Sequence, residues 1–233
     1  MMKVMKEITV EFPLKGEWTA ATTPGHRIPS HGTDLLGMTY AYDFVRLDWG
    51  RKDTHLHTRG AFQYLFGRVN LEDCPGWGQG IYSPFNGEVV EVINDQAEPK
   101  GLNFFRDTFR VLLNEITFTS KRLFKNHCYY SGNYIVLKGE SCYAAFAHIK
   151  KGSIVVSEGQ LVKSGQLLAQ VGHSGNSGAP HLHFQLMDNQ DITKANGLPC
   201  CFTELEIYDS NNHWKKVSSS IPQRWQKVRA INV

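Results

Sequence analysis

The chain has 233 residues, which is enough to bury a substantial hydrophobic core and is within the range of one all-β domain. Hydrophobic residues make up 41% of it and charged residues 20%, and no apolar run approaches the ~20 residues of a membrane-spanning helix. The formal net charge of +3 is too small to indicate a nucleic-acid-binding protein. We therefore expect a single domain over residues 1–233, with no transmembrane segment and no nucleic-acid partner.

The first residues, MMKVMKEITVEFPLKGEW, are predicted to form a strand and lack the apolar core and cleavage site of a secretory signal. The absence of a signal peptide predicts a cytoplasmic protein, or a secreted or periplasmic one if a leader has been removed. The five cysteines do not have the spacing of a metal site, so we expect reduced thiols.

Residues 24–50 are predicted to form a loop that leads into a strand. Proline and glycine interrupt the first part, whereas Tyr40 to Leu47 is an apolar run typical of a strand. The loop contains two histidines, of which we expect His26 to be solvated. Asp43 lies inside the apolar strand, where a buried carboxylate needs a partner such as a cation.

The middle of the chain contains a long polar loop, a strand and a helical insertion. The second HLH sequence, at His55 and His57, lies among charged residues of the loop, and we expect it to be solvent-exposed. The alternation in Ile81–Ile93 predicts a strand. From about 96 to 125, apolar residues at steps of three and four predict an amphipathic helix whose apolar stripe packs into the core. That stripe consists of Phe104, Phe105, Phe109, Leu112, Leu113 and Ile116.

The second half of the chain is predicted to consist of many short strands. Asn133–Leu137 and Ser141–Ile149 are apolar, and the latter ends in His148. Glycine turns then punctuate short apolar segments, as in antiparallel hairpins. Two further strands are predicted near the C-terminus, over residues 204–208 and 214–217.

Residues 171–187, VGHSGNSGAPHLHFQLM, combine a turn rich in glycine and serine with an apolar strand that contains two histidines. Side chains two apart in a strand point to the same face, about 7 Å from each other. His181 and His183 are therefore expected to face one site, with the spacing of metal ligands. The opposite face is apolar and consists of Leu182, Phe184 and Leu186.

The run GHSGNSGAPHLHF resembles the closing motif of the lysostaphin/LytM-type zinc endopeptidases, roughly GxSGxSxGPHLHF, with Ala179 in place of a glycine. The segments IYSPFNGEVVEVI and YAAFAHIKKGSIVVSEGQLVKSGQLLAQVG are also similar to elements of that family. The resemblance covers roughly residues 25–50, 81–93 and 133–185. It implies a mainly β fold, an antiparallel β-sandwich or roll of the duplicated hybrid motif type, here with a helical insertion.

The resemblance implies that His183 is a zinc ligand and that His181 and His148 are catalytic, without indicating which of the two is the base. The family's first motif, HxxxD, provides two further ligands, but here the histidine at position 31 is followed by an aspartate three residues later.

The segment YAYDF is similar to a variant of the family in which a loop separates the histidine from the aspartate, and we therefore pair His31 with Asp43. Asp34 remains the alternative carboxylate at this point.

Two histidine nitrogens and one carboxylate oxygen leave the fourth position of a tetrahedral Zn²⁺ open, which is the pattern of a catalytic site. The predicted ligands are His31, Asp43 and His183. The resemblance implies a zinc-dependent endopeptidase that acts on a peptide or peptidoglycan substrate and cleaves peptide bonds of bacterial peptidoglycan. The alternative is a non-catalytic binding or regulatory module on the same fold. The bond cleaved and the oligomeric state stay open.

Overall fold

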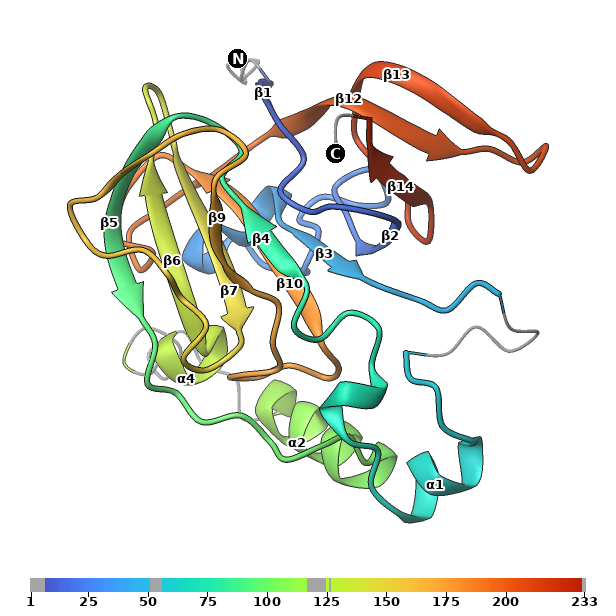
Figure 1. Ribbon diagram of the computed structural model, residues 1–233. Helices are drawn as coiled ribbons and strands as arrows, with labels where there is room; N and C mark the ends of the chain where they lie inside the picture. The colour runs from blue at the N-terminus through green and yellow to red at the C-terminus, as the bar shows by residue number, and fades with distance from the viewer. Residues whose placement is uncertain (1–6, 51–55, 117–124, 126, 232–233) are drawn as a thin grey trace.

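The computed structural model describes residues 7–50, 56–116, 125 and 127–231. The described chain is mainly β, and its α-helices gather at one end of the strands (Figure 1). The prediction of a mainly β fold with a helical insertion is confirmed, whereas the single-domain expectation stays a prediction. None of the described helices is long and apolar enough to cross a bilayer. All five cysteines are free, as expected.

The large sheet has the strand order β1-β12-β14-β2-β3-β10-β7-β6-β5-β8, with β11 beside β10 and β13 beside β12. All of these pairs are antiparallel except β1 with β12. Its strands are β1 (Ile8–Val10), β2 (Trp18–Thr22), β3 (Tyr42–Val45), β5 (Gly87–Ile93), β6 (Asn133–Lys138), β7 (Tyr143–Ile149), β8 (Leu161–Val162), β10 (His181–Met187), β11 (Gly197–Leu198), β12 (Cys200–Tyr208), β13 (Trp214–Ser220) and β14 (Lys227–Ala230).

A small second sheet pairs β4 (Gly80–Tyr82) with β9 (Leu167–Gln170) and lies against one face of the large sheet (Figure 1). The main hydrophobic core combines side chains of both sheets, such as Ile81 and Leu168 with Phe146 and Phe184. Burial of these two apolar faces against each other stabilises the layered arrangement.

Strand β10 separates its two kinds of side chain as its period of two requires. Leu182, Phe184 and Leu186 are fully buried in the core, while the alternate residues belong to the opposite face. The predicted split of this strand is confirmed. The polar face of β10 lies between β3 and β7, which pair with it on either side.

The remaining elements are short helices at the edges of the sheets. They are the 3-10 helices η1 (Leu35–Tyr40) and η2 (Leu71–Asp73), and the α-helices α1 (Ala61–Phe66), α2 (Phe104–Ile116) and α4 (His127–Ser131). Part of the predicted insertion, 117–124, lies outside the described residues, as does His55.

Two expectations about these segments are wrong. The apolar stripe of α2 does not face the core, because Phe105 and Phe109 are 54% and 62% exposed. Periodicity reports that a helix has an apolar face but not which way the face points. His57, expected to be solvated, is buried and packs its ring against Tyr64 of α1.

Candidate metal and catalytic site

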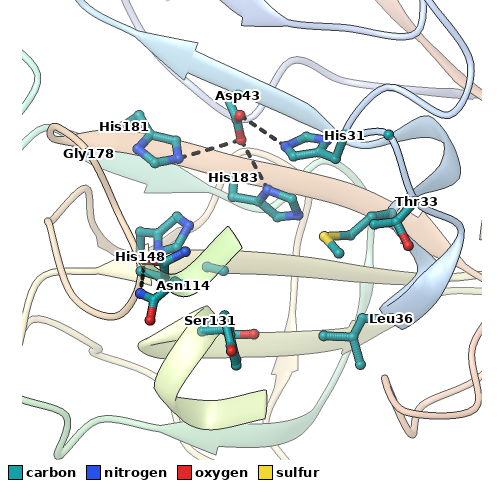
Figure 2. A pocket seen from close by; sticks show the side chains of 15 residues that line it. His31, Thr33, Leu36, Asp43, Asn114, Ser131, His148, Gly178, His181 and His183 are labelled. Carbon is teal, nitrogen blue, oxygen red and sulfur yellow. Dashed lines mark hydrogen bonds and ion pairs between the residues drawn. The ribbon is translucent and has the colours of Figure 1, made fainter. Parts of the chain in front are cut away.

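Three strands bring the predicted site residues to one cleft of about 600 Å³ (Figure 2). Asp43 comes from β3, His148 from β7, and His181 and His183 from β10. In the sheet, His183 lies directly opposite Asp43 on one side and Ala147 on the other. The register of the sheet therefore fixes the distance between the carboxylate and the imidazole, while His31 approaches from the loop before η1.

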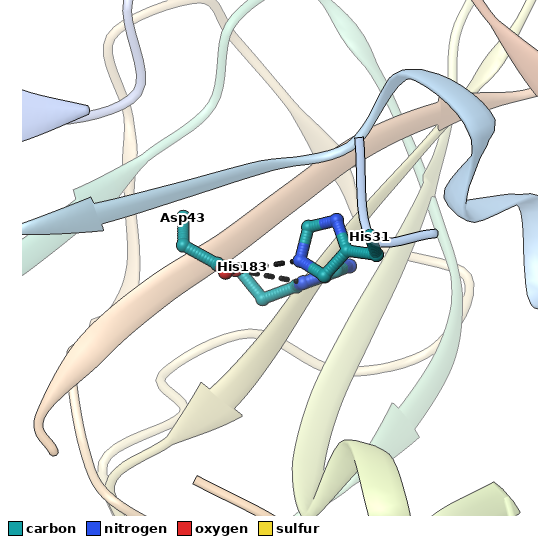
Figure 3. A group of neighbouring side chains, drawn as sticks. All are labelled: His31, Asp43 and His183. Atoms are coloured by element: carbon teal, nitrogen blue, oxygen red, sulfur yellow. Dashed lines mark hydrogen bonds and ion pairs between the residues drawn. The ribbon is translucent and has the colours of Figure 1, made fainter. Parts of the chain in front are cut away.

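Atoms of His31, Asp43 and His183 converge so closely that one ligand atom from each lies within 4.8 Å of the others (Figure 3). His31 Nε2 is 2.9 Å from Asp43 Oδ2, and His183 Nδ1 is 3.0 Å from Asp43 Oδ1. The three side chains are mostly buried, and Asp43 is 16% exposed. These are the three residues that the sequence analysis predicts as metal ligands.

The hydrogen bonds behind His31 determine which of its nitrogens faces the carboxylate. The hydroxyl of Ser30 donates to the carbonyl of Met38, so it accepts a hydrogen bond from His31 Nδ1–H at 3.0 Å. A neutral His31 then presents the lone pair of Nε2 to Asp43.

Gln185, on the same face of β10, has the same role behind His183. Its amide nitrogen donates to the carbonyl of Leu36 in η1 at 2.7 Å, so its oxygen faces His183 and accepts a hydrogen bond from Nε2–H at 2.9 Å. Gly37 allows this approach, because a Cβ there would lie 2.9 Å from the Gln185 amide nitrogen. Nδ1 of a neutral His183 therefore directs its lone pair at Asp43.

Two imidazole lone pairs that face one carboxylate repel it unless a cation or a proton lies between them. The donor set of two nitrogens and one oxygen is the set that Zn²⁺ prefers in catalytic sites. The residues present thus fit a zinc ion, and an outer shell of Ser30 and Gln185 orients both imidazoles, as is usual for zinc-binding histidines.

His148 and His181 lie beside this group without belonging to it. Their ring centroids are 4.6 Å apart, and the His148 ring is 6.0 Å from the His183 ring. His148 Nδ1–H donates to the carbonyl of Ser174, and His181 Nδ1–H donates to the carbonyl of Ala179, each at 2.8 Å. Both histidines therefore direct Nε2 toward the cleft, where His181 Nε2 lies 3.5 Å from Asp43 Oδ1.

The backbone of His148 has φ +60°, a left-handed conformation that is uncommon for a residue with a Cβ. Such strain persists only where the surrounding structure enforces it, and it clusters at functional sites. Here the carbonyl of His148 accepts a hydrogen bond from the amide of Gly172, and a Cβ at Gly172 would lie 2.2 Å from the Lys150 nitrogen. The close crossing of these two segments sets the direction of the His148 ring.

The charges of the cleft shift the pKa values of its groups in opposite directions. Burial would raise the pKa of Asp43, but the adjacent imidazoles of His31 and His181 hold it well below its usual range. Burial, with His181 and His183 nearby, lowers the pKa of His148 well below normal. Burial also opposes the charged form of His181, but Asp43 outweighs it and raises the pKa. Neighbouring histidines thus have different protonation equilibria.

The two rival residues of the first motif lie elsewhere. Asp34 is at the start of η1, where its carboxylate accepts a hydrogen bond from Thr39 Oγ1 at 3.0 Å. His26 is exposed, and its ring faces the Arg224 guanidinium. Neither residue is part of the three-residue group.

Sequence reasoning missed the contribution of α2 to this site. Asn114 lines the cleft, and its amide donates to Asn176 Oδ1 at 2.6 Å. One turn earlier, the Arg110 guanidinium donates to the carbonyl of Ser177 at 2.6 Å. Both partners lie in the loop that leads into His181. The available signal was the helical spacing of Asp107, Arg110 and Asn114, which places the three polar side chains on one face of the predicted helix.

A second cleft of about 650 Å³ opens on the other side of Asp43 and His181, which line both clefts. Its walls are largely aromatic and aliphatic, with Trp49, Tyr64 and Trp225 among the lining residues. Asp43 and His181 therefore border two clefts, an arrangement that suits an extended ligand.

Residues 118–195, about a third of the chain, match the sequence profile of Peptidase family M23. The matched segment contains His148, His181 and His183, and the resemblance inferred from the closing motif is confirmed at the level of the family. His31 and Asp43 lie outside the matched M23 segment.

Two curated relatives are peptidoglycan DD-endopeptidases of Vibrio cholerae. ShyB is 44% identical over 59 residues, which cover 25% of this chain and 13% of the relative. ShyA is 38% identical over 64 residues, which cover 27% of this chain and 14% of the relative. The match to each thus spans less than a fifth of the relative's length.

Among solved structures, a zinc-containing peptidase from Vibrio cholerae is 20% identical, with a TM-score of 0.40 over 83% of this chain and 41% of that one. The catalytic domain of lysostaphin from Staphylococcus simulans is 17% identical, with a TM-score of 0.39 over 78% of this chain and 88% of that one.

Proposed function

We propose that this protein is a zinc-dependent endopeptidase that cleaves peptide bonds of bacterial peptidoglycan. The observation that carries the proposal is the convergence of His31 Nε2, the Asp43 carboxylate and His183 Nδ1 within 4.8 Å, in a cleft that also contains His148 and His181. The family of residues 118–195 supports the same reaction class.

His31, Asp43 and His183 would hold the zinc ion. A bound Zn²⁺ supplies a Lewis acid that polarises a peptide carbonyl and lowers the pKa of water to about 7. Ser30 and Gln185 keep the two ligand imidazoles in the required tautomer through the hydrogen bonds described above.

His148 and His181 would handle protons and stabilise the developing oxyanion. Each has its Nδ1–H fixed on a backbone carbonyl, so Nε2 is the atom that can take up or release a proton in the cleft. The two rings lie side by side, close enough to act on the attacking and leaving groups of one peptide bond. Separate substitution of His148 and His181 would show which ring acts as the base.

ShyA and ShyB are named as peptidoglycan DD-endopeptidases. The D,D cross-link between stem peptides is therefore the first bond to test as a substrate of this protein. Such a substrate lies outside the cytoplasmic membrane, and this chain would act there.

The test is digestion of purified peptidoglycan by the zinc-loaded protein, with soluble fragments identified by mass and new amino groups quantified. We expect fragment release that a chelator abolishes and added zinc restores, and that the His183→Ala protein lacks. Stoichiometric zinc without any fragment release would contradict the proposal. If the protein then co-sedimented with intact peptidoglycan, the non-catalytic binding module would take its place, as the altered first motif allows.

A further inference from the structure

Helix α2 directs its polar face toward the protein and its apolar face outward. Its residues Asp107 and Asn114 are buried against the protein, with the half-buried Arg110 between them on the same face. A surface helix ordinarily directs its apolar face to the core and its polar face to water. Here the hydrogen bonds of Arg110 and Asn114 to the loop before His181 anchor the polar face, and Asp107 forms an ion pair with Arg110 within the helix.

The outward face of α2 is apolar and continues onto α1. Phe105, Phe109 and Leu112 are 54%, 62% and 49% exposed, and on α1 Phe62 and Phe66 are 78% and 67% exposed. The rings of Phe66 and Phe105 lie 6.0 Å apart, and those of Phe62 and Phe66 lie 5.2 Å apart, so the two helices form one surface. We call these five side chains the aromatic patch.

The patch is unusual for this molecule as well as for a protein surface. In the described part of the chain, seven of the fourteen exposed large hydrophobic side chains belong to α1 and α2. Contiguous exposed apolar surface of this kind marks a site of interaction. The polar anchoring of α2 means that the helix cannot turn its apolar face inward without losing the contacts that hold the site loop.

The charge around the patch indicates the chemistry of its partner. Arg68 and Lys100 are exposed next to the patch, where α1 ends and α2 begins, and Arg106 is 45% exposed on α2 itself. Phenylalanine and leucine bordered by lysine and arginine are typical of helices that lie in the interface of an anionic bilayer.

We propose that the aromatic patch seats the protein on the surface of a bilayer that contains anionic phospholipid. The phenyl rings enter the boundary between headgroups and acyl chains, and the basic side chains contact the headgroup phosphates. Because α2 separates the patch from the cleft that Asn114 lines, docking would hold that cleft roughly one helix diameter, about 10 Å, from the membrane. This inference does not depend on the proposed hydrolysis.

The test is co-sedimentation of the full chain with vesicles, in the presence of a chelator and without any peptide substrate. Vesicles of phosphatidylcholine mixed with phosphatidylglycerol are compared with vesicles of phosphatidylcholine alone. We expect binding to the mixed vesicles that weakens as salt is added. The Phe105→Ser/Phe109→Ser variant should bind at least about tenfold more weakly, because each ring contributes apolar area to the bilayer contact.

The matched control is Val155→Ser/Leu161→Ser, which removes two apolar side chains that are 63% and 78% exposed on or near the edge strand β8. It should bind vesicles like the unaltered protein. Phe62→Ser/Phe66→Ser provides a second patch variant should the first one fold poorly, as judged by circular dichroism.

Three results would overturn the proposal: no binding to mixed vesicles, equal losses in the patch and control variants, or a dimer that becomes a monomer only when the patch is altered. The last result would assign the patch to a second copy of the chain. Hydrolysis of a soluble peptidoglycan fragment, measured separately, shows whether the catalytic proposal stands or fails independently.

Discussion

The site is built from two regions that constrain their residues in different ways. On β3 and β10, backbone pairing places Asp43 and His183 directly opposite each other, and His183 pairs on its other side with Ala147 of β7, the residue before His148. The loop between β9 and β10 has no such ladder, and side chains of α2 hold it through Asn176 and Ser177. We therefore expect metal affinity to depend mainly on the strands, and the position of the loop in front of the proposed zinc ligands to depend on the insertion.

The largest expected effect is on metal binding. His183→Ala and Asp43→Asn should lower zinc affinity by more than about 100-fold, because each removes a direct ligand atom and leaves two. Asp34→Asn is the matched control, since this carboxylate contacts Thr39 outside the group. Zinc content after dialysis provides the measurement. Loss of metal in the Asp34 variant but not in the Asp43 variant would contradict this assignment and make Asp34 the carboxylate ligand.

Hydrolysis should separate from metal binding at the two remaining histidines. His181→Ala and His148→Ala should retain zinc but lose about 10²–10⁴-fold in kcat, the usual contribution of a proton-transferring side chain. Parallel measurements of zinc content and fragment release check this. A metal-free His181→Ala protein, together with a zinc-loaded His183→Ala protein, would reverse the assignment within the HLH pair.

A smaller effect on zinc affinity is expected at Gln185, which accepts a hydrogen bond from the proposed ligand His183. Gln185→Leu removes the acceptor for His183 Nε2–H and should lower zinc affinity by about 10–100-fold. Gln185→Glu retains an acceptor oxygen and should restore part of that affinity. Competition with a coloured chelator measures both variants. Unchanged affinity in Gln185→Leu would mean that the sheet alone orients His183.

The insertion should affect turnover without affecting the metal. Arg110→Ala and Asn114→Ala release the loop before His181 and should lower kcat/KM by about tenfold, because small displacements of catalytic groups are costly. Thr108→Ala, on the exposed side of the same helix, is the matched control. Zinc content should be the same in all three proteins, and a loss of metal would show that α2 supports the ligands as well.

The smallest effect concerns the pH dependence of the free energy of unfolding, to which His173 in the loop between β9 and β10 contributes. Burial, with Arg110 nearby, lowers the pKa of His173 to about 3. Because the unfolded chain binds this proton more readily, stability is complete above the ordinary pKa of about 6.5 and declines as pH falls towards 3. His173→Gln should flatten that decline. Urea unfolding of metal-free protein at neutral pH and at about pH 4.5 checks it, and identical pH dependence in both proteins would contradict the pKa.

The strand residues of the site could be predicted in part because strands have a period of two, whereas the choice of His31 and His148 depended on the family resemblance. The HLH spacing placed His181 and His183 on one face, and the apolar neighbours of Asp43 indicated a buried carboxylate that needs a partner. The roles of Ser30 and Gln185 could not be predicted, because each depends on a carbonyl of η1 or its vicinity that only the folded chain brings near.

The orientation of α2 could not be predicted for a different physical reason. A helical repeat of apolar residues fits a core-facing helix and an outward-facing one equally well. The polar residues decide here, since Arg110 and Asn114 find their partners in the loop between β9 and β10, while the buried Asp107 pairs with Arg110 of the same helix. Ser177 and Asn176 lie 67 and 62 residues after Arg110 and Asn114. The local pattern of residues therefore gives no indication of these partners.

The location of the metal distinguishes most directly between these assignments. Crystals of the zinc-loaded protein, measured with X-rays on both sides of the zinc absorption edge, would show it as an anomalous peak. The predicted result is a single strong peak bounded by His31 Nε2, the Asp43 carboxylate and His183 Nδ1. A peak at Asp34, a peak ligated by His148 or His181 in place of His31, or no peak in zinc-saturated crystals would contradict the account.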